Sequence, residues 1–426
     1  MKFTLRQLGV LFVIANLSFS FAGQAMGADV EEDFKKAVSE RDKGNLDDSI
    51  VIFESILSQE PTLHRARLEL AVAYYRATQF EEAEQNAKKV LADPKTPATV
   101  RLSIIAFLAK IKSEKARFEK VGSTYSVSVE GGYLYDTNVN VGPSSDVVNI
   151  GTQTLRLAAG SSPQSDGAVT LSGTFNYSYQ TGKVVRVGGK SAAVLWQSQA
   201  SIYSKQYNDL SEFNLDVVSL STGLAFIAPL EWRANLNLRV DNIELGSDAL
   251  AFYTSLLPSI TWQLNKTTEL TVNASLADRD YKQSNDEVRD SFYKSIGVVL
   301  GKRYMNGKVS LQAGLTLFDE DADDDRFSRD GTNVFLGANW EAWENGSLYA
   351  SFSQRNSKHE DPEFLFNEKR DEREERFVVG FRHQFSNKYL DKWVLKGSYS
   401  NTDNRSNVDI FTYDREVTSV TLSRDF

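Results

Sequence analysis

The sequence predicts two domains, a short all-α domain of helical repeats and then a transmembrane antiparallel β-barrel of about fourteen strands. From Tyr125 to Phe426, segments of about ten residues alternate apolar and polar side chains and are separated by turn residues. Before them, residues 29–118 read as helices in which apolar and small residues recur with a period of 34 residues. The predicted boundaries are 28–120 for the helical domain and 121–426 for the barrel.

The first residues, 1–27, predict a secretory signal peptide. Two basic residues precede an apolar run at 8–22, and small residues that suit a signal peptidase follow it. An uncleaved membrane anchor is the alternative, but a run of about fifteen residues with several polar members is short for a bilayer span. We therefore expect cleavage after Ala25 or Gly27.

Composition narrows the possible chemistry. The chain has no cysteine, which excludes lipidation of its own N-terminus, disulfides, thiolate catalysis and cysteine metal sites. A formal net charge of -9 without any basic cluster argues against nucleic acid as a ligand. After the signal peptide, no apolar stretch approaches the roughly eighteen residues of a transmembrane helix. If the mature chain lies in a membrane, it must therefore cross as a closed barrel.

The alternation is clear in two segments. In 309–317 the odd-numbered residues are apolar and their neighbours are polar or small. In 232–241 one face is apolar, and the other carries Arg233, Asn235, Asn237, Arg239 and Asp241. These polar groups suit a hydrated lumen, so we predict that they line the barrel interior. A soluble antiparallel sandwich also alternates, and periodicity alone does not separate the two folds.

The strand count favours fourteen. Thirteen candidate strands lie between residues 168 and 426, and two weaker candidates lie upstream at 125–135 and 152–160. Bacterial single-chain barrels have even strand numbers with both chain ends in the periplasm. We therefore expect that one of the weaker pair does not span the membrane.

Short connections alternate with longer polar segments, which are expected to be extracellular loops. The predicted loops are 242–249, 282–289, 319–329, 357–373 and 402–413. At the chain end, Val420, Leu422 and the terminal Phe426 share one face, which resembles the signal read by the barrel-insertion machinery. That machinery and outer-membrane lipid are therefore expected partners, and the expected location is the outer membrane with the helical domain in the periplasm.

The helical period resembles the tetratricopeptide repeat. Ala37 recurs as Ala71, and two repeats would span 30–63 and 64–97, with a further helix at 98–111 covering the last one.

In that family the first helix of each pair lines a groove that binds peptides or protein surfaces. The resemblance implies groove residues on this chain at Arg41, Leu68, Tyr75 and Arg76. Leu68 fits a core position equally well. The other three combine charge with stacking area and are better candidates for ligand contacts.

Residues 129–140 read VEGGYLYDTNVN. Helical repeats followed by a barrel with this segment resemble the surface lipoprotein assembly modifier (Slam) family. That family carries a similar aromatic-Asp-x-Asn-x-Asn segment where its barrel begins, matched here by Tyr135, Asp136, Asn138 and Asn140. The resemblance implies an outer-membrane translocon that delivers surface lipoproteins, or related secreted proteins, to the cell surface. Its partners would be that cargo and a periplasmic chaperone.

Two interpretations of this junction motif are open. Short polar side chains hydrogen-bond turn backbone, so Asp136, Asn138 and Asn140 could simply cap the first strand. Alternatively, they line the lumen where cargo enters from the helical domain.

No enzyme motif is present, and we predict no catalytic residues, no metal site and no cofactor. The three histidines, His64, His359 and His383, are scattered along the chain. The acidic cluster at 319–325 lacks the glycine and glutamate of a calcium-binding loop, so it is interpreted as a solvated outer loop with loose divalent binding as the alternative. The segment 368–376, EKRDEREER, is interpreted as a self-paired hairpin rim, or as a contact for emerging cargo.

Two rival functions remain. One is a passive outer-membrane porin whose repeats form a periplasmic protein-binding module. The other is export of polysaccharide.

Overall fold

The computed structural model describes residues 28–150, 153–187, 190–229 and 231–426, so the predicted signal peptide lies outside the described residues. These residues form two compact units. The helical unit contains the described residues up to Val121 together with Gln180–Val194, and the barrel unit contains Gly122–Tyr179 and Leu195–Phe426. Within the described part of the chain, no helix has the length and hydropathy to cross a bilayer.

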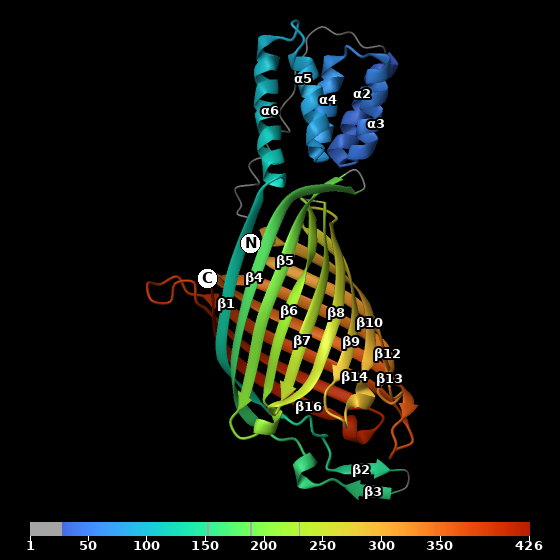
Figure 1. Ribbon diagram of the computed structural model, residues 1–426, viewed down its shortest axis with the longest axis vertical. Helices are drawn as coiled ribbons and strands as arrows, with labels where there is room; N and C mark the ends of the chain where they lie inside the picture. The colour runs from blue at the N-terminus through green and yellow to red at the C-terminus, as the bar shows by residue number, and fades with distance from the viewer. Residues whose placement is uncertain (1–27, 151–152, 188–189, 230) are drawn as a thin grey trace. The chain divides into compact units, whose positions relative to one another are not determined.

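The helical unit is built from consecutive helices that pack on one another (Figure 1). They are α2 (Ala28–Lys43), α3 (Leu46–Gln59), α4 (His64–Arg76), α5 (Phe80–Leu91) and α6 (Ala98–Phe118). Ala37 and Ala71, the small residues of the predicted repeat, are completely buried where helices cross. Larger side chains fill the rest of the core, with Phe53 and Phe107 both fully buried. The predicted helical-repeat fold is therefore confirmed.

The barrel unit is a sheet closed on itself. In the described residues its fourteen strands follow the order β1, β16, β15 and so on to β4. Their bounds are β1 (Val121–Asp136), β4 (Asp166–Val187), β5 (Lys190–Tyr207), β6 (Leu215–Ala228), β7 (Trp232–Leu245), β8 (Asp248–Gln263), β9 (Thr268–Tyr281), β10 (Ser291–Tyr304), β11 (Val309–Ala322), β12 (Arg329–Trp343), β13 (Gly346–Pro362), β14 (Lys369–Gln384), β15 (Val394–Ser406) and β16 (Tyr413–Asp425). The predicted strand number and antiparallel barrel are confirmed.

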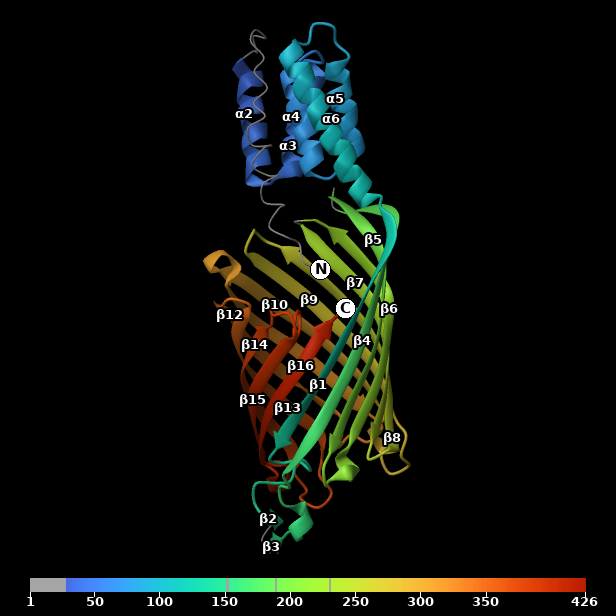
Figure 2. The ribbon, with the colours of Figure 1, turned by 90° about the vertical axis from the view of Figure 1, so that its left-hand side faces the viewer.

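Closure is made by the first and last strands. β16 runs antiparallel to β1, with Asp136 opposite Val417 and Ser128 opposite Asp425, as the adjacent strands in Figure 2 show. The weaker candidate strand at 152–160 does not join the barrel. Its residues fall partly in β3 (Gln153–Arg156), which pairs only with β2 (Val147–Ile150) in the connection between β1 and β4.

The strands carry opposite chemistry on their two faces. On β11, Leu315 and Leu317 are exposed, whereas the alternate residues Phe318 and Glu320 are buried. Since successive side chains point to opposite faces, the exposed leucines mark the outer wall and the buried residues mark the lumen. A closed barrel with an apolar outer face is the architecture of outer-membrane β-barrels, and the soluble sandwich alternative is excluded.

Four of the five predicted outer loops are shorter than expected, whereas the fifth, 282–289, agrees with the connection 282–290 between β9 and β10. β11 continues to Ala322 and β12 begins at Arg329, so only 323–328 connect them. Likewise, 363–368 connect β13 to β14 and 407–412 connect β15 to β16. The polar residues at these ends remain in the strand ladder, because their backbone groups pair with neighbouring strands whatever the side chain is.

Candidate functional site

The four predicted groove residues do not form one surface. Leu68 is 0% exposed, so it is a core residue and its assignment as a groove contact is wrong. Arg41 and Arg76 do come together at Asp42, whose Oδ1 lies 3.2 Å from Arg41 Nε and 3.1 Å from Arg76 Nη1. Arg41 also pairs with Glu69 on α4. These ion pairs join α2 to α4.

Tyr75 lies against different neighbours. Its ring packs edge-on against Phe80 at 5.9 Å and Phe107 at 5.5 Å between centroids, and Lys110 Nζ lies 5.8 Å from the ring centre. Burial raises the pKa of the Tyr75 hydroxyl. Burial also lowers the pKa of the Arg76 guanidinium, against the opposing effect of Asp42. Both side chains are half-buried, which leaves only part of each available to a ligand.

The sequence analysis did not predict an exposed apolar stripe on α6. Leu102 is 69% exposed and Ile105 is 52% exposed, and their spacing of three residues puts them on one helix face. Apolar residues recur with the 3.6-residue period of the helix on the exposed face as well as on the buried face of α6. The sequence alone therefore did not show which of the two faces is buried.

The turn end of the β4–β5 hairpin belongs to the helical unit. Ser191 N donates to Thr78 Oγ1 at 2.9 Å, just after α4. Arg186 Nη2 contacts both carboxylate oxygens of Glu82 on α5 at 2.8 Å. Gln180 Nε2 donates to the carbonyl oxygens that end α6, at 2.9 and 3.1 Å. This hairpin end therefore packs on α4, α5 and α6 through specific polar contacts.

The junction motif is built around a buried carboxylate. Asp136 is 1% exposed at the end of β1. Arg415 Nε on β16 lies 3.0 and 3.1 Å from its two oxygens, and the Arg415 Nη2 also pairs with it. The Tyr207 hydroxyl on β5 donates to Oδ2 at 2.9 Å, and Asn138 N donates to Oδ1 at 3.1 Å. We call this the Asp136 clamp, and it links β1, β5 and β16.

The two asparagines order the connection that follows β1. Asn138 Nδ2 donates to the carbonyl oxygens of Gly142 and Asp414, both at 2.9 Å, and its Oδ1 accepts from Gly142 N at 2.7 Å. Asn140 donates to Ser162 O at 2.9 Å and accepts from Gln164 N at 2.9 Å. Tyr135 takes no part in these bonds and is exposed.

The position of the motif corrects the idea that it lies where cargo would enter from the helical domain. β1 has 16 residues, and Asp136 is the last of them, whereas α6 ends just before Val121. At about 3.3 Å per residue the motif is about 50 Å along the strand from Val121. The segment caps the far end of the first strand, where the two asparagines bind turn backbone and Asp136 binds the Arg415 and Tyr207 side chains.

The predicted lumen residues of β7 share the inward face. Arg233 Nη2 lies 2.8 Å from Glu269 Oε2 on β9, and Asn235 Nδ2 lies 3.4 Å from Ser259 Oγ on β8. Asn237 lies opposite Gly223 of β6.

Arg239 completes this face of β7. Its Nη2 lies 2.7 Å from Asp241 Oδ1, and it donates to Ser219 Oγ at 3.2 Å. The outward neighbours Leu236 and Leu238 are exposed. The polar face of β7 is thus a row of paired groups.

The predicted acidic loop is shorter than expected, because residues 323–325 lie in the connection between β11 and β12 whereas the earlier acidic residues of the cluster belong to β11. Glu320 is buried on the inward face of β11, where it pairs with Arg279 of β9 and lies 2.9 Å from Arg329 Nε of β12. Ser291 Oγ donates to the same carboxylate at 3.1 Å. The Arg279 guanidinium lies 4.3 Å from the centre of the Tyr293 ring. In the described residues, no group of three or more histidine and acidic side chains is arranged to hold a metal ion.

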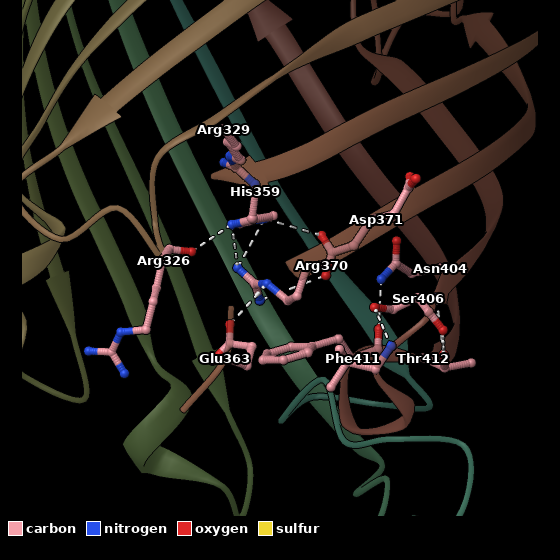
Figure 3. Close-up of polar contacts among 12 residues, drawn as sticks. Arg326, Arg329, His359, Glu363, Arg370, Asp371, Asn404, Ser406, Phe411 and Thr412 are labelled. Atoms are coloured by element: carbon pink, nitrogen blue, oxygen red, sulfur yellow. Dashed lines mark hydrogen bonds and ion pairs between the residues drawn. The ribbon is translucent and has the colours of Figure 1, made fainter. Parts of the chain in front are cut away.

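A further cluster of polar and aromatic side chains surrounds Arg370 (Figure 3). Its Nη2 lies 3.0 and 3.1 Å from the two ring nitrogens of His359, and its Nε lies 3.1 Å from Glu363 Oε1. His359 Nδ1 lies 2.7 Å from the carbonyl oxygen of Arg326. The Phe411 ring centre is 4.1 Å from the guanidinium.

Residues 369–376 of the segment 368–376 form the first half of strand β14. Part of its charge is self-paired, as predicted, because Arg373 pairs with Glu375 and Arg370 lies 3.7 Å from Glu372. The charges divide between the two faces of the strand. Arg370, Glu372 and Glu374 point into the barrel, whereas the residues between them, such as Arg373, point outward.

A cavity of about 250 Å³ lies among these inward residues. Its lining combines guanidinium, carboxylate and aromatic groups from the last strands of the barrel: Val141, Arg329, Arg355, Ser357, Arg370, Glu372, Glu374, Asn404, Ile410, Phe411 and Tyr413. It is the candidate binding site of the barrel unit.

Comparison with known proteins adds one family and several distant structures. The model of a family described as tetratricopeptide repeat matches residues 40–98. No curated protein matches the chain. Similar solved structures include OpdO of Pseudomonas aeruginosa, with 11% identity, 71% of this chain and 97% of that chain covered, and a TM-score of 0.37. An anion-selective porin from Comamonas acidovorans has 10% identity, coverage of 72% and 100%, and a TM-score of 0.39. The loop L8 deletion mutant of OmpT, an outer membrane protein of Vibrio cholerae, has 6% identity, coverage of 72% and 99%, and a TM-score of 0.40.

Proposed function

We propose that this chain is an outer-membrane export channel that delivers a lipoprotein or another secreted protein to the cell surface. The observation that carries the proposal is that one chain joins a tetratricopeptide-repeat region, residues 40–98, to a closed fourteen-strand barrel. Stacked helical repeats present extended surfaces for binding other proteins. Passive diffusion of small solutes requires no such module.

The topology supports a periplasmic role for the repeats. An even number of strands returns both ends of the barrel sequence to the same side of the membrane, which is the periplasmic side in single-chain bacterial barrels. The repeats precede β1 directly, so they would meet cargo or its chaperone on that side. In this scheme Arg76 and the exposed α6 residues Leu102 and Ile105 are the accessible contacts of the module.

The resemblance of the Tyr135–Asp136–Asn138–Asn140 segment to the Slam family supports a lipoprotein cargo. The geometry gives this segment a supporting role, since the Asp136 clamp holds the first and last strands together and the asparagines order the adjoining connection. The polar lumen face supports passage of a hydrated polypeptide, because it offers hydrogen-bonding groups along the wall. No catalytic step is part of the proposal.

Gene deletion tests the proposal. Surface biotinylation with mass spectrometry should show loss of one specific surface protein, while uptake of small solutes stays normal. Complementation with the full chain should restore that protein. Complementation with a double variant in α6, Leu102→Ser with Ile105→Ser, should restore the barrel in the membrane but not the surface protein.

A passive porin is the second candidate, and the charged cavity inside the barrel favours it. Reduced solute uptake with an unchanged surface proteome would establish the porin and reject export. Loss of exopolysaccharide with an unchanged surface proteome would instead establish polysaccharide export.

A further inference from the structure

The first half of α6 carries an apolar face that stays exposed in the helical unit. The opposite side of the helix, with Val100, Ile104 and Phe107, is buried against the preceding helices. Leu102 and Ile105 are exposed, and exposed alanines extend the same face: Ala98, Ala106 and Ala109. We call these five residues the α6 face. They span about 17 Å, or about three turns of helix.

Basic side chains flank the α6 face. Residues 98–113 contain Arg101, Lys110 and Lys112 and no acidic residue. Arg101 and Lys112 are about three turns apart on one flank, and Lys110 lies on the other. Arg101 Nη1 donates to the carbonyl oxygen of Asp93 at 3.2 Å, a bond that brings no carboxylate to the guanidinium. Lys112 is exposed and forms no ion pair with any residue that the structure describes.

The second half of α6 differs from the first, because its charges are neutralised within the unit. Arg117 pairs with Glu114. Lys115 pairs with Glu81 of α5. The carbonyl oxygens at the helix end accept hydrogen bonds from Gln180 of the hairpin end. The uncompensated positive charge of α6 therefore lies beside the α6 face.

This charge decides between possible occupants of the face. A second copy of the chain does not suit it, since both copies would bring Arg101 and Lys112 to the contact and like charges repel. A membrane surface does not suit it either, because interfacial helices bury a wide apolar face that is rich in Trp, Phe or Leu. The α6 face has only Leu102 and Ile105 as large apolar side chains and has no aromatic ring. A protein surface with an apolar centre and acidic edges fits both properties.

The shape of the α6 face fits a helix. Each of α3, α4 and α5 packs between two helices, whereas α6 packs on its neighbours through its buried side alone. In stacked repeats the next helix covers such a face. The small alanines beside Leu102 and Ile105 form grooves that accept the side-chain ridge of a second helix.

We propose that the α6 face binds an acidic amphipathic helix of about three turns in the exported protein. This helix takes the place that a further repeat helix would take. The assignment to the exported protein rests on the proposed function, whereas the acidic and apolar chemistry of the helix rests on the α6 face alone.

Two stapled helical peptides of about fourteen residues test the chemistry. Both carry the same Leu and Ala face, which is flanked by Glu in one peptide and by Lys in the other. Binding is measured by fluorescence anisotropy with the full chain in phosphatidylcholine nanodiscs, and empty nanodiscs serve as the blank. The Glu-flanked peptide should bind about tenfold more tightly than the Lys-flanked peptide, because only its charges complement those of α6.

Variants of the α6 face test its location. Leu102→Ser with Ile105→Ser should raise the Kd of the Glu-flanked peptide about tenfold, since two apolar contacts are lost. Lys112→Glu should raise that Kd about threefold and lower the Kd of the Lys-flanked peptide by a similar factor. The matched controls are Val51→Ser on α3 and Lys36→Glu on α2, both at exposed positions, and they should bind like the wild type.

Hydrogen exchange of the α5 and α6 amides checks that each variant is folded. Equal affinity for the two peptides would overturn the proposal, as would unchanged affinities in folded Lys112→Glu. A wild-type dimer in sedimentation that dissociates in the double serine variant would assign the face to a second copy instead. Flotation of the nanodiscs with phosphatidylglycerol vesicles, lost in the same variant, would assign it to lipid.

A crosslink in cells tests the source of the helix. The photoreactive variant Ala106→p-benzoylphenylalanine should crosslink to an acidic helix of the surface protein that gene deletion removes. Crosslinks to a different periplasmic protein alone would reject the exported protein as the source. Failure of this inference is distinct from failure of export: a surface proteome unchanged by deletion rejects export, whereas equal peptide affinities reject the acidic helix and leave export standing.

Discussion

Arg415 on β16 contacts both carboxylate oxygens of Asp136 on β1, so an ion pair joins the last strand of the barrel to the first. The two residues are 279 positions apart in the chain. With Tyr207 of β5 bound to the same carboxylate, three strands are held at one point of the rim.

Removing the carboxylate should weaken barrel closure. Asp136→Ala removes a carboxylate that is 1% exposed and leaves Arg415, whose side chain is 28% exposed, without it. Breaking a buried pair costs about 3 to 5 kcal/mol, and the partial exposure of Arg415 places the expected cost at the lower end of that range. The free energy of unfolding in urea, followed by the heat-modifiable gel shift, should fall by about that amount. Asp403→Ala, which breaks the exposed pair with Arg405, is the control and should cost about 1 kcal/mol or less. Similar losses in both variants would contradict the clamp.

Asn138 should control the order of the connection between β1 and β4. Its side chain is buried and serves three backbone groups, so Asn138→Ala leaves each of them unsatisfied at about 1 to 3 kcal/mol per group. Limited proteolysis of intact cells should then cleave residues 137–165 faster than in the wild type. Asn242→Ala removes an exposed contact to Glu244 and should leave the cleavage rate unchanged. An unaltered rate in Asn138→Ala would show that other contacts hold the connection.

Leu68 is expected to act through stability. Leu68→Ala opens a hole in the core of the helical unit and should cost about 2 to 5 kcal/mol. Leu102→Ala, at an exposed position of α6, should stay within about 0.5 kcal/mol. Hydrogen exchange of the α4 amides in the full chain measures both. Normal protection in Leu68→Ala together with lost cargo capture would restore Leu68 as a groove residue.

The helical unit should lose stability in acid through Glu81. The ammonium of Lys115, 2.8 Å away on α6, holds the pKa of Glu81 below its ordinary value of 4.5. A lowered pKa contributes stability that is present above 4.5 and is lost as the pH falls through the lower, folded-state value. Exchange protection in α5 and α6 should therefore decrease from pH 6 to pH 3, after correction for the intrinsic pH dependence of exchange.

Glu81→Gln should remove part of this acid-dependent loss and lower protection already at pH 6. Glu84→Gln is the matched control, since Glu84 pairs with Lys88 within α5 and does not join the two helices. Equal pH profiles in the wild type and in Glu81→Gln would show that the Lys115 pair contributes nothing.

Local periodicity predicted the barrel well because a strand exposes its side chains with a period of two and lipid accepts only one of the two faces. Leu315 and Leu317 could be assigned to the outer wall without knowing any neighbour. The same rule placed Arg233 and Arg239 on the inner face. It also overestimated the length of four of the predicted loops. Polar side chains at the end of a strand do not show whether the backbone there still hydrogen-bonds to the neighbouring strand.

In the helical domain, too, periodicity located some features correctly and misplaced others. The recurrence of Ala37 as Ala71 predicted where helices cross, and both are buried. The groove assignment of Leu68 was wrong, since apolar spacing does not distinguish a surface stripe from a core. The exposed stripe at Leu102 and Ile105 was missed for the same reason.

The sequence by itself determined the two kinds of domain, the fourteen strands and the face on which each side chain lies, because these depend on repeats of 2 and 34 residues within local segments. Only the tertiary structure decided that Asp136 meets Arg415, that Glu320 pairs with both Arg279 and Arg329, and that Arg370 lies against His359 and Glu363. Each of these depends on strand register and on closure between distant segments, and the free energy of an ion pair is set by the distance and burial that register creates.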